Sequence, residues 1–350
     1  MDEQPLRVGV VGLGVRGQHA YHQALAAQPG VRLMRLAPHP ASSPVILEGH
    51  GQAFFEEEAK RCNATLCRDP EEVITAKDVD IVCVLVEPSL AFDVIRRCAE
   101  AGKHIFRDKP MVLTAGEANR VVEAVERAGV RMAVGWGAFR FNPPYGELRA
   151  KVAEGAIGEV VAATFLMPWG GGPLAGFTCS KDHHDRYGGG EVHNFAGYAL
   201  AYLRWLLGAE RPIRRVWAQM AAFFYPDYVA AGNEDLASLS FEFDGGAVAS
   251  VVTGRLPAAC GEVCELAVVG TRGTLRLSGY TSASRLVAGA PSRVDYGQSG
   301  MGPLAADFVR AIREGRRPAI DHREGRAIHL ALLAAYESAR AGRAVELPPL

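Results

Sequence analysis

Residues 102–111 read Gly102-Lys103-His104-Ile105-Phe106-Arg107-Asp108-Lys109-Pro110-Met111, after a run of helical character at 89–101. The apolar centre predicts a short strand that ends at the charged pair Asp108-Lys109. Proline disfavours helix at Lys109 and fixes the chain as it leaves the strand. At the carboxyl edge of a parallel sheet, such a lysine points into the crevice where these sheets bind ligands. An isolated Asp-Lys-Pro is more often a surface turn, but the segments on either side favour a nucleotide fold.

Length and composition narrow the classes of protein. A chain of 350 residues predicts two domains. The net charge of −1 gives no electrostatic case for nucleic acid or an anionic membrane. No run approaches the roughly 20 apolar residues of a membrane span, and we expect no signal peptide. The seven cysteines are scattered without a Cys-x-x-Cys pair, so we expect reduced thiols in a cytoplasmic protein.

The N-terminal part carries a dinucleotide-binding pattern. Residues 7–11 form a short apolar strand, and a helix that ends near Gln28 opens at once from the loop Gly12-Leu13-Gly14-Val15-Arg16-Gly17. The glycines allow a tight turn and a close backbone approach, and the helix N-terminus offers N–H groups to a pyrophosphate. The pattern predicts that this loop binds NAD(P).

The next strand, residues 31–37, bears on the choice of cofactor. A carboxylate roughly 20 residues past the glycines usually meets the adenosine ribose of NAD. Here the chain continues Ala37-Pro38-His39-Pro40-Ala41-Ser42-Ser43, and no Asp or Glu occurs between Gly17 and Glu48. No acid near in sequence would repel a 2′-phosphate, and His39, Ser42 and Ser43 can contact one. NADP is slightly favoured over NAD, although no arginine stands nearby in sequence.

Three further segments complete the first domain. Residues 80–86 are continuously apolar, as in a strand buried on both faces, and Glu87-Pro88 follows where the chain would pass the nicotinamide ribose. Thr114 and Glu117 form a capping box for a helix that stops at Gly129. Residues 131–136 are the last strand. We therefore predict a doubly wound Rossmann domain over 1–136, with cofactor contacts also from Val86, Glu87, Pro88, Asp108 and Lys109.

Residues 137–350 predict a mixed α+β domain. Residues 238–243 alternate like a half-buried strand, and Gly270-Thr271-Arg272-Gly273 forms a hairpin turn. Two late segments carry helical apolar stripes, one through Leu304 and Phe308 and the other through Ile328 and Leu332.

Over nearly its whole length the chain resembles the glucose–fructose oxidoreductase and inositol dehydrogenase family, often called Gfo/Idh/MocA. Residues 12–17 match its nucleotide loop, and 102–111 match its Gly-Lys-His…Glu-Lys-Pro segment, with Asp108 for the usual Glu and Lys109 kept. Residues 155–160, 270–273 and 336–339 match as well. The resemblance implies a Rossmann domain followed by a domain with a large open, mostly antiparallel sheet used for oligomer contacts. It also implies nicotinamide-dependent chemistry at a carbon bearing oxygen, mostly on sugars, cyclitols and related polyols.

The second family signature departs from its pattern. The family has Asp-x-Gly-x-His-x-x-Asp after a glycine run, and the corresponding positions here hold Asn194, Tyr198 and Ala201. On an α-helix these three share one face, and we expect that face to look at the lysine crevice. Tyrosine at the histidine position also occurs in relatives resembling glucose–fructose oxidoreductase and dihydrodiol dehydrogenase. It does not account for the loss of both carboxylates.

Other polar residues have two interpretations each. Cys179, Asp182, His183, His184, Asp185 and His193 suggest zinc, but their spacing is irregular and hydride transfer needs no metal, so we expect none. Trp169 and His183 are interpreted as walls of a polar substrate pocket. His193 suits satisfied packing and substrate contact equally, and Arg140 either points into the crevice or caps a helix.

The combined prediction is a cytoplasmic NAD(P)-dependent oxidoreductase that acts on a sugar-like or cyclic polyol, or the matching ketone. Lys109 would hold the reacting oxygen, and Tyr198 would handle its proton; Asn194 completes the substrate contacts. A phenol with a reference pKa of about 10 is a proton donor at neutral pH, so we expect reduction to dominate there. The alternatives are a redox-neutral enzyme with a retained nicotinamide (epimerase, lyase or glycosidase) and a non-catalytic nucleotide sensor. The expected partners are the small polar substrate and further copies of the chain, in a homodimer or homotetramer formed through the C-terminal sheet.

Overall fold

A computed structural model describes residues 4–13, 19–43, 52–137, 139–172, 180–209, 211–279, 285–288, 290–293 and 301–348. The chain forms two compact units. Unit 1 contains Met1–Trp136, Asp185–Gly188 and Met301–Arg326, and unit 2 contains Gly137–His184, Gly189–Gly300 and Ala327–Leu350. Within the described ranges, no helix is both long enough and apolar enough to cross a membrane.

Unit 1 is built on a six-stranded parallel sheet in the order β3-β2-β1-β4-β5-β6. The strands are β1 (Leu6–Val11), β2 (Val31–Ala37), β3 (Thr65–Leu66), β4 (Ile81–Val84), β5 (His104–Arg107) and β6 (Met132–Val134). Every residue of β4 is buried, as expected for a strand covered on both faces. The strand order reverses between β1 and β4, which is where doubly wound sheets bind nucleotides. The Rossmann prediction is confirmed.

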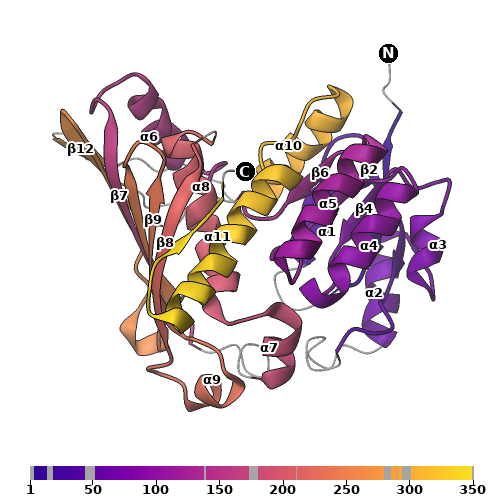
Figure 1. The fold of residues 1–350 in the computed structure, drawn as a ribbon. Helices are drawn as coiled ribbons and strands as arrows, with labels where there is room; N and C mark the ends of the chain where they lie inside the picture. Colours follow the sequence, from indigo (N-terminus) through magenta and orange to yellow (C-terminus); the bar gives the residue numbers. More distant parts are fainter. Residues whose placement is uncertain are drawn as a thin grey trace. The chain divides into compact units, whose positions relative to one another are not determined.

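Four helices of unit 1 pack in pairs, α1 beside α10 and α4 beside α5, and the second pair is labelled side by side in Figure 1. They are α1 (His19–Ala26), α2 (Gln52–Cys62), α3 (Pro70–Ile74), α4 (Pro88–Glu100), α5 (Ala115–Ala128) and α10 (Met301–Arg313). α5 begins and ends as its sequence predicts. The Thr114 side chain accepts from Glu117 N, the Glu117 carboxylate accepts from Thr114 N, and Gly129 closes the helix at φ 67°.

Helix α10 follows the second-domain sequence but packs in unit 1. Its Phe308 ring stacks on Phe106 of β5, with centroids 5.2 Å apart, and Phe106 in turn meets Tyr21 of α1 at 5.9 Å. By its sequence position this helix is predicted in the second domain, because a periodic apolar stripe shows that a helix face is buried but not which sheet it covers.

Unit 2 is built on a nine-stranded sheet in the order β14-β13-β12-β11-β7-β10-β9-β8-β15. The strands are β7 (Val160–Trp169), β8 (Ile213–Ala221), β9 (Leu236–Phe243), β10 (Val248–Arg255), β11 (Glu265–Gly270), β12 (Gly273–Ser278), β13 (Arg285–Ala288), β14 (Ala290–Arg293) and β15 (Val345–Glu346). All neighbouring strands are antiparallel except β7 and β10. The prediction of a large, mostly antiparallel sheet is confirmed.

One face of this sheet is the core of unit 2. Phe165, Leu239, Phe241 and Val251 alternate inward, and α8 packs on β7 and β10. The helical elements are α6 (Pro143–Ala153), α7 (Lys181–Tyr187), which ends in unit 1, a π turn (Val192–Ala196), α8 (Gly197–Leu207), α9 (Pro226–Ala231), a 3-10 turn (Ala258–Cys260) and α11 (His322–Ala341), which begins in unit 1. Figure 1 shows the long α11 in yellow.

Candidate functional site

Lys109 lies just beyond the carboxyl end of β5, at the sheet edge where its sequence predicts it. The segment is fixed on both sides of the lysine. Asp108 N donates to the Val84 carbonyl at 3.3 Å, and Lys109 N donates to the carboxylate of the buried Asp108 at 2.6 Å. Lys109 itself is half-buried, and its peptide bond to Pro110 is cis.

A buried cation that the sequence analysis missed holds this segment. The Arg107 side chain is completely buried and donates to four carbonyl oxygens, those of Val84, Val86, Pro110 and Met111, at 2.8–3.1 Å. Burial lowers the pKa of this arginine. Because two acceptors follow Lys109 and two lie at the end of β4, Arg107 joins the loops that end both strands. In the sequence, an arginine at the end of an otherwise apolar strand, directly before Asp108 and Lys109, could have indicated this buried cation.

The start of the nucleotide loop fits a dinucleotide. Gly12 has φ 78°, and a Cβ there would lie 2.7 Å from the Leu85 carbonyl oxygen, so only glycine lets the chain turn so close to the end of β4. Gly12 N donates to the Ala37 carbonyl at 2.8 Å, and Leu13 is buried. The predicted contacts Gly14, Val15, Arg16 and Gly17 lie outside the described residues.

The loop after β2 contains the predicted contacts Pro38, His39 and Ser42, and the structure adds two charges to it. The carboxylate of Glu87, 2% exposed, accepts from Ser42 Oγ and from Ser43 N, both at 2.8 Å. Arg186 Nη1 donates to the Ala41 carbonyl at 3.0 Å and lies 3.5 Å from Glu87 Oε1. Burial lowers the pKa of His39.

These contacts bear on two expectations. The chain at Glu87-Pro88 is predicted to pass the nicotinamide ribose, and the Glu87 carboxylate is turned to the loop after β2, where the adenosine ribose is expected. The loop was also interpreted as lacking a nearby carboxylate and arginine. Both are present, because Glu87 comes from the end of β4 and Arg186 from α7, far away in the sequence. Val86 and Pro88 flank Glu87 and are buried.

In unit 2 the predicted helix face is interrupted by the π turn Val192–Ala196, which precedes α8. Hydrogen bonds of the i→i+5 type wind more residues into a turn, so Asn194 and Tyr198 are not related by ordinary α-helical spacing. Tyr198 is half-buried, with its ring edge-on to Phe139 at 6.4 Å, whereas Ala201 is buried. Of the three residues predicted to share one face, Asn194 and Tyr198 are thus half-buried and Ala201 is buried.

A buried ion pair behind the π turn was also missed. Glu191 and Arg255 are both buried, and Arg255 Nε lies 2.7 Å from Glu191 Oε1. Tyr228 donates its hydroxyl proton to the same Glu191 oxygen at 2.5 Å, and Asn194 Nδ2 donates to Glu191 Oε2 at 3.0 Å. The pair thus fixes the amide of Asn194, a predicted substrate contact.

A second buried carboxylate holds the start of the same turn. Glu234 accepts from Gly190 N, Val192 N and the Tyr336 hydroxyl, at 2.7–3.2 Å. Burial raises the pKa of this carboxyl group.

The other predicted substrate contacts differ in their surroundings. Trp169 is 37% exposed and stacks on Phe195 of the π turn at 6.2 Å. Arg140 lies over the Trp205 ring at 5.0 Å, which is a cation–π contact, and His183 is buried in α7. His193 is 1% exposed and packs against Tyr336 at 4.7 Å and His329 at 5.9 Å. This burial favours the packing interpretation of His193.

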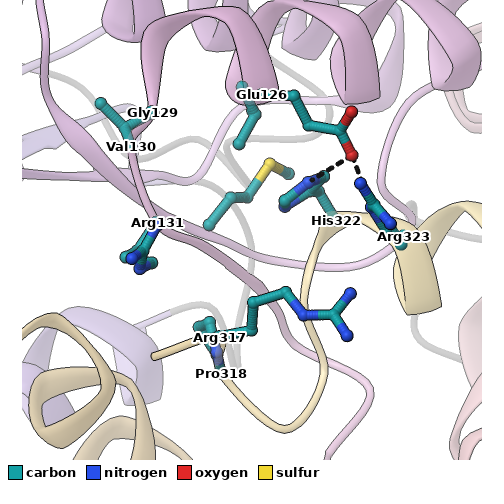
Figure 2. Close-up of a pocket in the computed structure, with 10 residues that line it drawn as sticks. Glu126, Gly129, Val130, Arg131, Arg317, Pro318, His322 and Arg323 are labelled. Carbon is teal, nitrogen blue, oxygen red and sulfur yellow. Dashed lines mark hydrogen bonds and ion pairs between the residues drawn. The ribbon is translucent and has the colours of Figure 1, made fainter. Parts of the chain in front are cut away.

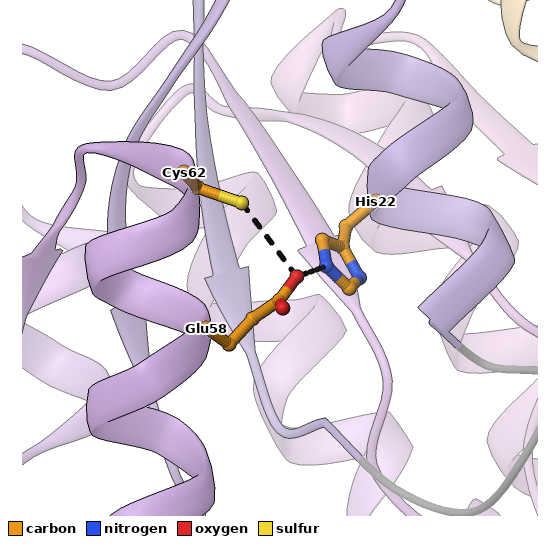
Figure 3. Close-up of side chains that lie close together, drawn as sticks. All are labelled: His22, Glu58 and Cys62. Atoms are coloured by element: carbon orange, nitrogen blue, oxygen red, sulfur yellow. Dashed lines mark hydrogen bonds and ion pairs between the residues drawn. The ribbon is translucent and has the colours of Figure 1, made fainter.

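Among the described residues, one group offers three metal-ligand atoms, and it differs from the set around His183 and His193, whose Cys179 lies outside the described residues. His22, Glu58 and Cys62 lie together in unit 1 (Figure 3), with His22 Nε2 at 2.6 Å and Cys62 Sγ at 3.6 Å from Glu58 Oε1. The Arg61 guanidinium also contacts Glu58 and lowers the pKa of that carboxyl to about 2, and burial raises the pKa of the Cys62 thiol. A carboxylate already paired with arginine beside a protonated thiol is a poor metal site.

A pocket of ≈ 240 Å³ in unit 1 lies between the end of α5 and the start of α11 (Figure 2). Its charged side chains all have partners: Arg323 and His322 lie against Glu126, Arg317 lies 3.4 Å from Asp321, and Arg131 donates to the Gly315 carbonyl. Arg131 and Met132, at the amino end of β6, also line it, so it lies away from the carboxyl strand ends. None of the predicted site residues lines this pocket, and we assign it no ligand.

Comparison with protein families identifies both parts of the chain. A model described as "Oxidoreductase family, NAD-binding Rossmann fold" matches residues 6–136, and one described as "GFO/IDH/MocA C-terminal domain" matches residues 145–276.

Individual relatives agree with this. The chain is 27% identical over 274 residues to scyllo-inositol 2-dehydrogenase (NAD(+)) of Bacillus subtilis, which covers 78% of this chain and 74% of the relative. It is 25% identical over 292 residues to myo-inositol 2-dehydrogenase of Thermotoga maritima, and the match covers 80% of this chain and 83% of that relative. Among solved structures, the chain superposes on aldose-aldose oxidoreductase from Caulobacter crescentus, complexed with glycerol, with a TM-score of 0.82 at 22% identity. The match covers 98% of this chain and 100% of that structure's chain. That structural match shows the fold.

Proposed function

Because this chain belongs to the Gfo/Idh/MocA oxidoreductase family, we propose that it transfers a hydride between NAD(P) and an oxygen-bearing carbon of a sugar, cyclitol or related polyol or ketone. The observation that carries the proposal is Lys109 at the carboxyl end of β5, held by the buried Arg107. A fixed ammonium there stabilises the negative charge that develops on a substrate oxygen. The named activities of the inositol dehydrogenase relatives support the substrate class.

The two domains predicted from the sequence have different proposed roles, one in nucleotide binding and the other in substrate binding. Residues 1–136 bind the nucleotide through the glycine loop, the loop after β2 and the end of β4, and residues 137–350, apart from the segment Asp185–Gly188 that packs in unit 1, bind the substrate. When bound, NAD(P) accepts or supplies the hydride. NADP is slightly preferred, since no acid stands between Gly17 and Glu48 in the sequence and Arg186 brings a cation to the loop after β2, where the Glu87 carboxylate binds Ser42 and Ser43.

Tyr198 is the proposed proton carrier. In reduction its hydroxyl gives a proton to the oxygen of a ketone while Lys109 stabilises the charge on that oxygen; in oxidation the same groups act in reverse. Asn194 and Trp169 are proposed substrate contacts because both lie at the π turn, where Glu191 fixes the Asn194 amide and Phe195 supports the indole. Arg140 and His183 stay proposed contacts from the sequence.

The test is a steady-state assay of the purified chain with NAD or NADP and a panel of inositols, aldoses and their ketones. We expect the absorbance of the added nicotinamide to change with at least one of them. A redox-neutral enzyme would convert a substrate with no change in added nicotinamide. A sensor would bind nucleotide and convert no member of the panel.

We further propose that the chain works in the cytoplasm as a homodimer or homotetramer formed through the face of the nine-stranded sheet that carries Trp217, Val248 and Val269. Each of these side chains is 38–40% exposed. Light scattering coupled to size exclusion tests the assembly, and Trp217→Glu should shift it toward monomer, because a buried unpaired charge is costly.

A further inference from the structure

The short segment Asp185–Gly188 packs in a different unit from its neighbours in the sequence. The sequence before and after it belongs to unit 2, but these four residues pack in unit 1. Arg186 makes the contacts described above, to the Ala41 carbonyl and to Glu87. A cation is therefore delivered to the loop after β2 from a distant part of the chain.

This loop is where the ribose of the adenosine is expected in a doubly wound fold. Nucleotides with and without a 2′-phosphate differ only at that ribose. A guanidinium matches a phosphate with paired, charge-assisted hydrogen bonds, which a serine hydroxyl does not. Arg186 is 27% exposed, so the guanidinium is fixed by the loop and still accessible to a ligand.

Glu87 is the opposing charge. Its carboxylate is held by Ser42 Oγ, Ser43 N and Arg186. These bonds fix the loop, and the same negative charge competes with a phosphate for Arg186.

We propose that Arg186 binds the 2′-phosphate of NADP, and that Glu87, which pairs with Arg186 and with Ser42, limits how strongly it does so. The two residues together set the preference between NADP and NAD. This assignment rests on the proposed function only in requiring that the chain bind a nicotinamide dinucleotide.

The experiment measures dissociation constants for NADPH and NADH by fluorescence titration, with 2′,5′-ADP and 5′-ADP as competitors that isolate the adenosine end. Arg186→Ala should lower the affinity for NADPH and for 2′,5′-ADP by about 10-fold or more. The affinities for NADH and 5′-ADP should change much less. Arg186→Lys should recover part of the loss, since it keeps the charge without the paired geometry. Glu87→Gln should raise the affinity for NADPH relative to NADH by about threefold to fivefold, as removal of one nearby charge predicts.

Arg96→Ala is the matched control, because Arg96 is a surface arginine of α4 paired with Asp93 and Glu100. It should leave the NADPH to NADH ratio unchanged. Retained NADH binding shows that each variant is folded. The assignment would be overturned if Arg186→Ala lowered the affinities for NADPH and NADH equally. It would also be overturned if the ratio of the two affinities were unchanged in both Arg186→Ala and Glu87→Gln. Failure of the wild-type chain to bind either dinucleotide would instead overturn the proposed function.

Discussion

Arg107 Nη2 donates to the carbonyl oxygen of Pro110 at 2.8 Å, so a completely buried cation supports the backbone just after Lys109. Its other bonds, to Val84 and Val86, attach that backbone to the end of β4. The lysine on which the proposed chemistry depends is therefore held in place from within the sheet.

Replacing this cation should affect stability and turnover together. Arg107→Met removes a donor from four buried carbonyls, of which that of Val84 keeps its bond from Asp108 N, and should lower the free energy of unfolding by roughly 3 kcal/mol. Arg107→Lys keeps a charge but not the four-point geometry, and should lower kcat more than it weakens nucleotide binding. Urea unfolding and titration measure these effects, with the surface variant Arg96→Met as the control. Wild-type stability and turnover in Arg107→Met would show that Arg107 does not support the site.

Lys109→Ala should lower kcat by about 100-fold or more, because it removes the charge that stabilises the developing alkoxide. Nucleotide affinity should change little, and Lys109→Arg should restore only part of the rate. Single-turnover and titration experiments separate the two quantities. An unchanged rate in Lys109→Ala would mean that Asp-Lys-Pro is only a turn.

Tyr198→Phe tests the proton carrier. The wild type should reduce ketones at neutral pH and oxidise alcohols increasingly as the pH rises, because a phenol donates a proton readily below a pKa of about 10 and accepts one only when ionised. The variant should lose most activity in both directions and also this pH dependence. If it keeps both, another group carries the proton.

The Glu191–Arg255 pair predicts a specific pattern of stabilities. Arg255→Met leaves the buried Glu191 carboxylate without its cation and should cost about 3–5 kcal/mol. The double variant Glu191→Gln/Arg255→Met removes both charges and should recover much of that loss. Chemical denaturation of the wild type, both single variants and the double variant gives the coupling energy. Additive losses would show that the two charges do not act as a pair.

Glu58 and His22 predict acid sensitivity. The Glu58 pKa is lowered to about 2, first by the hydrogen bond from Arg61, so its stabilisation is present above the ordinary carboxyl pKa of 4.5 and is lost as pH falls toward 2. Burial lowers the His22 pKa, so stability also declines below the ordinary histidine value of 6.5. Both effects have the same sign, because the unfolded chain binds more protons.

Glu58→Gln should therefore lower stability at neutral pH by roughly 2 kcal/mol, a figure discounted for the exposure of Arg61. It should also flatten the fall in Tm between pH 5 and about 2. Glu123→Gln, at an exposed position of α5, is the control. A wild-type pH profile in Glu58→Gln would contradict this account.

The sequence by itself determined the local elements of this protein. Alternating and continuous apolar runs predicted the strands, Thr114 and Glu117 predicted the start of α5, and the glycine loop with the Asp108-Lys109-Pro110 segment indicated a nucleotide fold with a lysine at the sheet edge. These features depend on neighbouring residues and on backbone geometry, so a linear pattern records them.

Only the tertiary structure decided which distant charges meet. The loop after β2 acquires Glu87 and Arg186 from positions 45 and 145 residues away from their partners Ser42 and Ala41. The π turn breaks the α-helical spacing on which the Asn194–Tyr198–Ala201 face was predicted, and Phe106 draws α10 into unit 1. In each case the contacts depend on packing between segments that are remote in the chain. A buried polar side chain needs hydrogen-bond partners, and local sequence periodicity does not identify them.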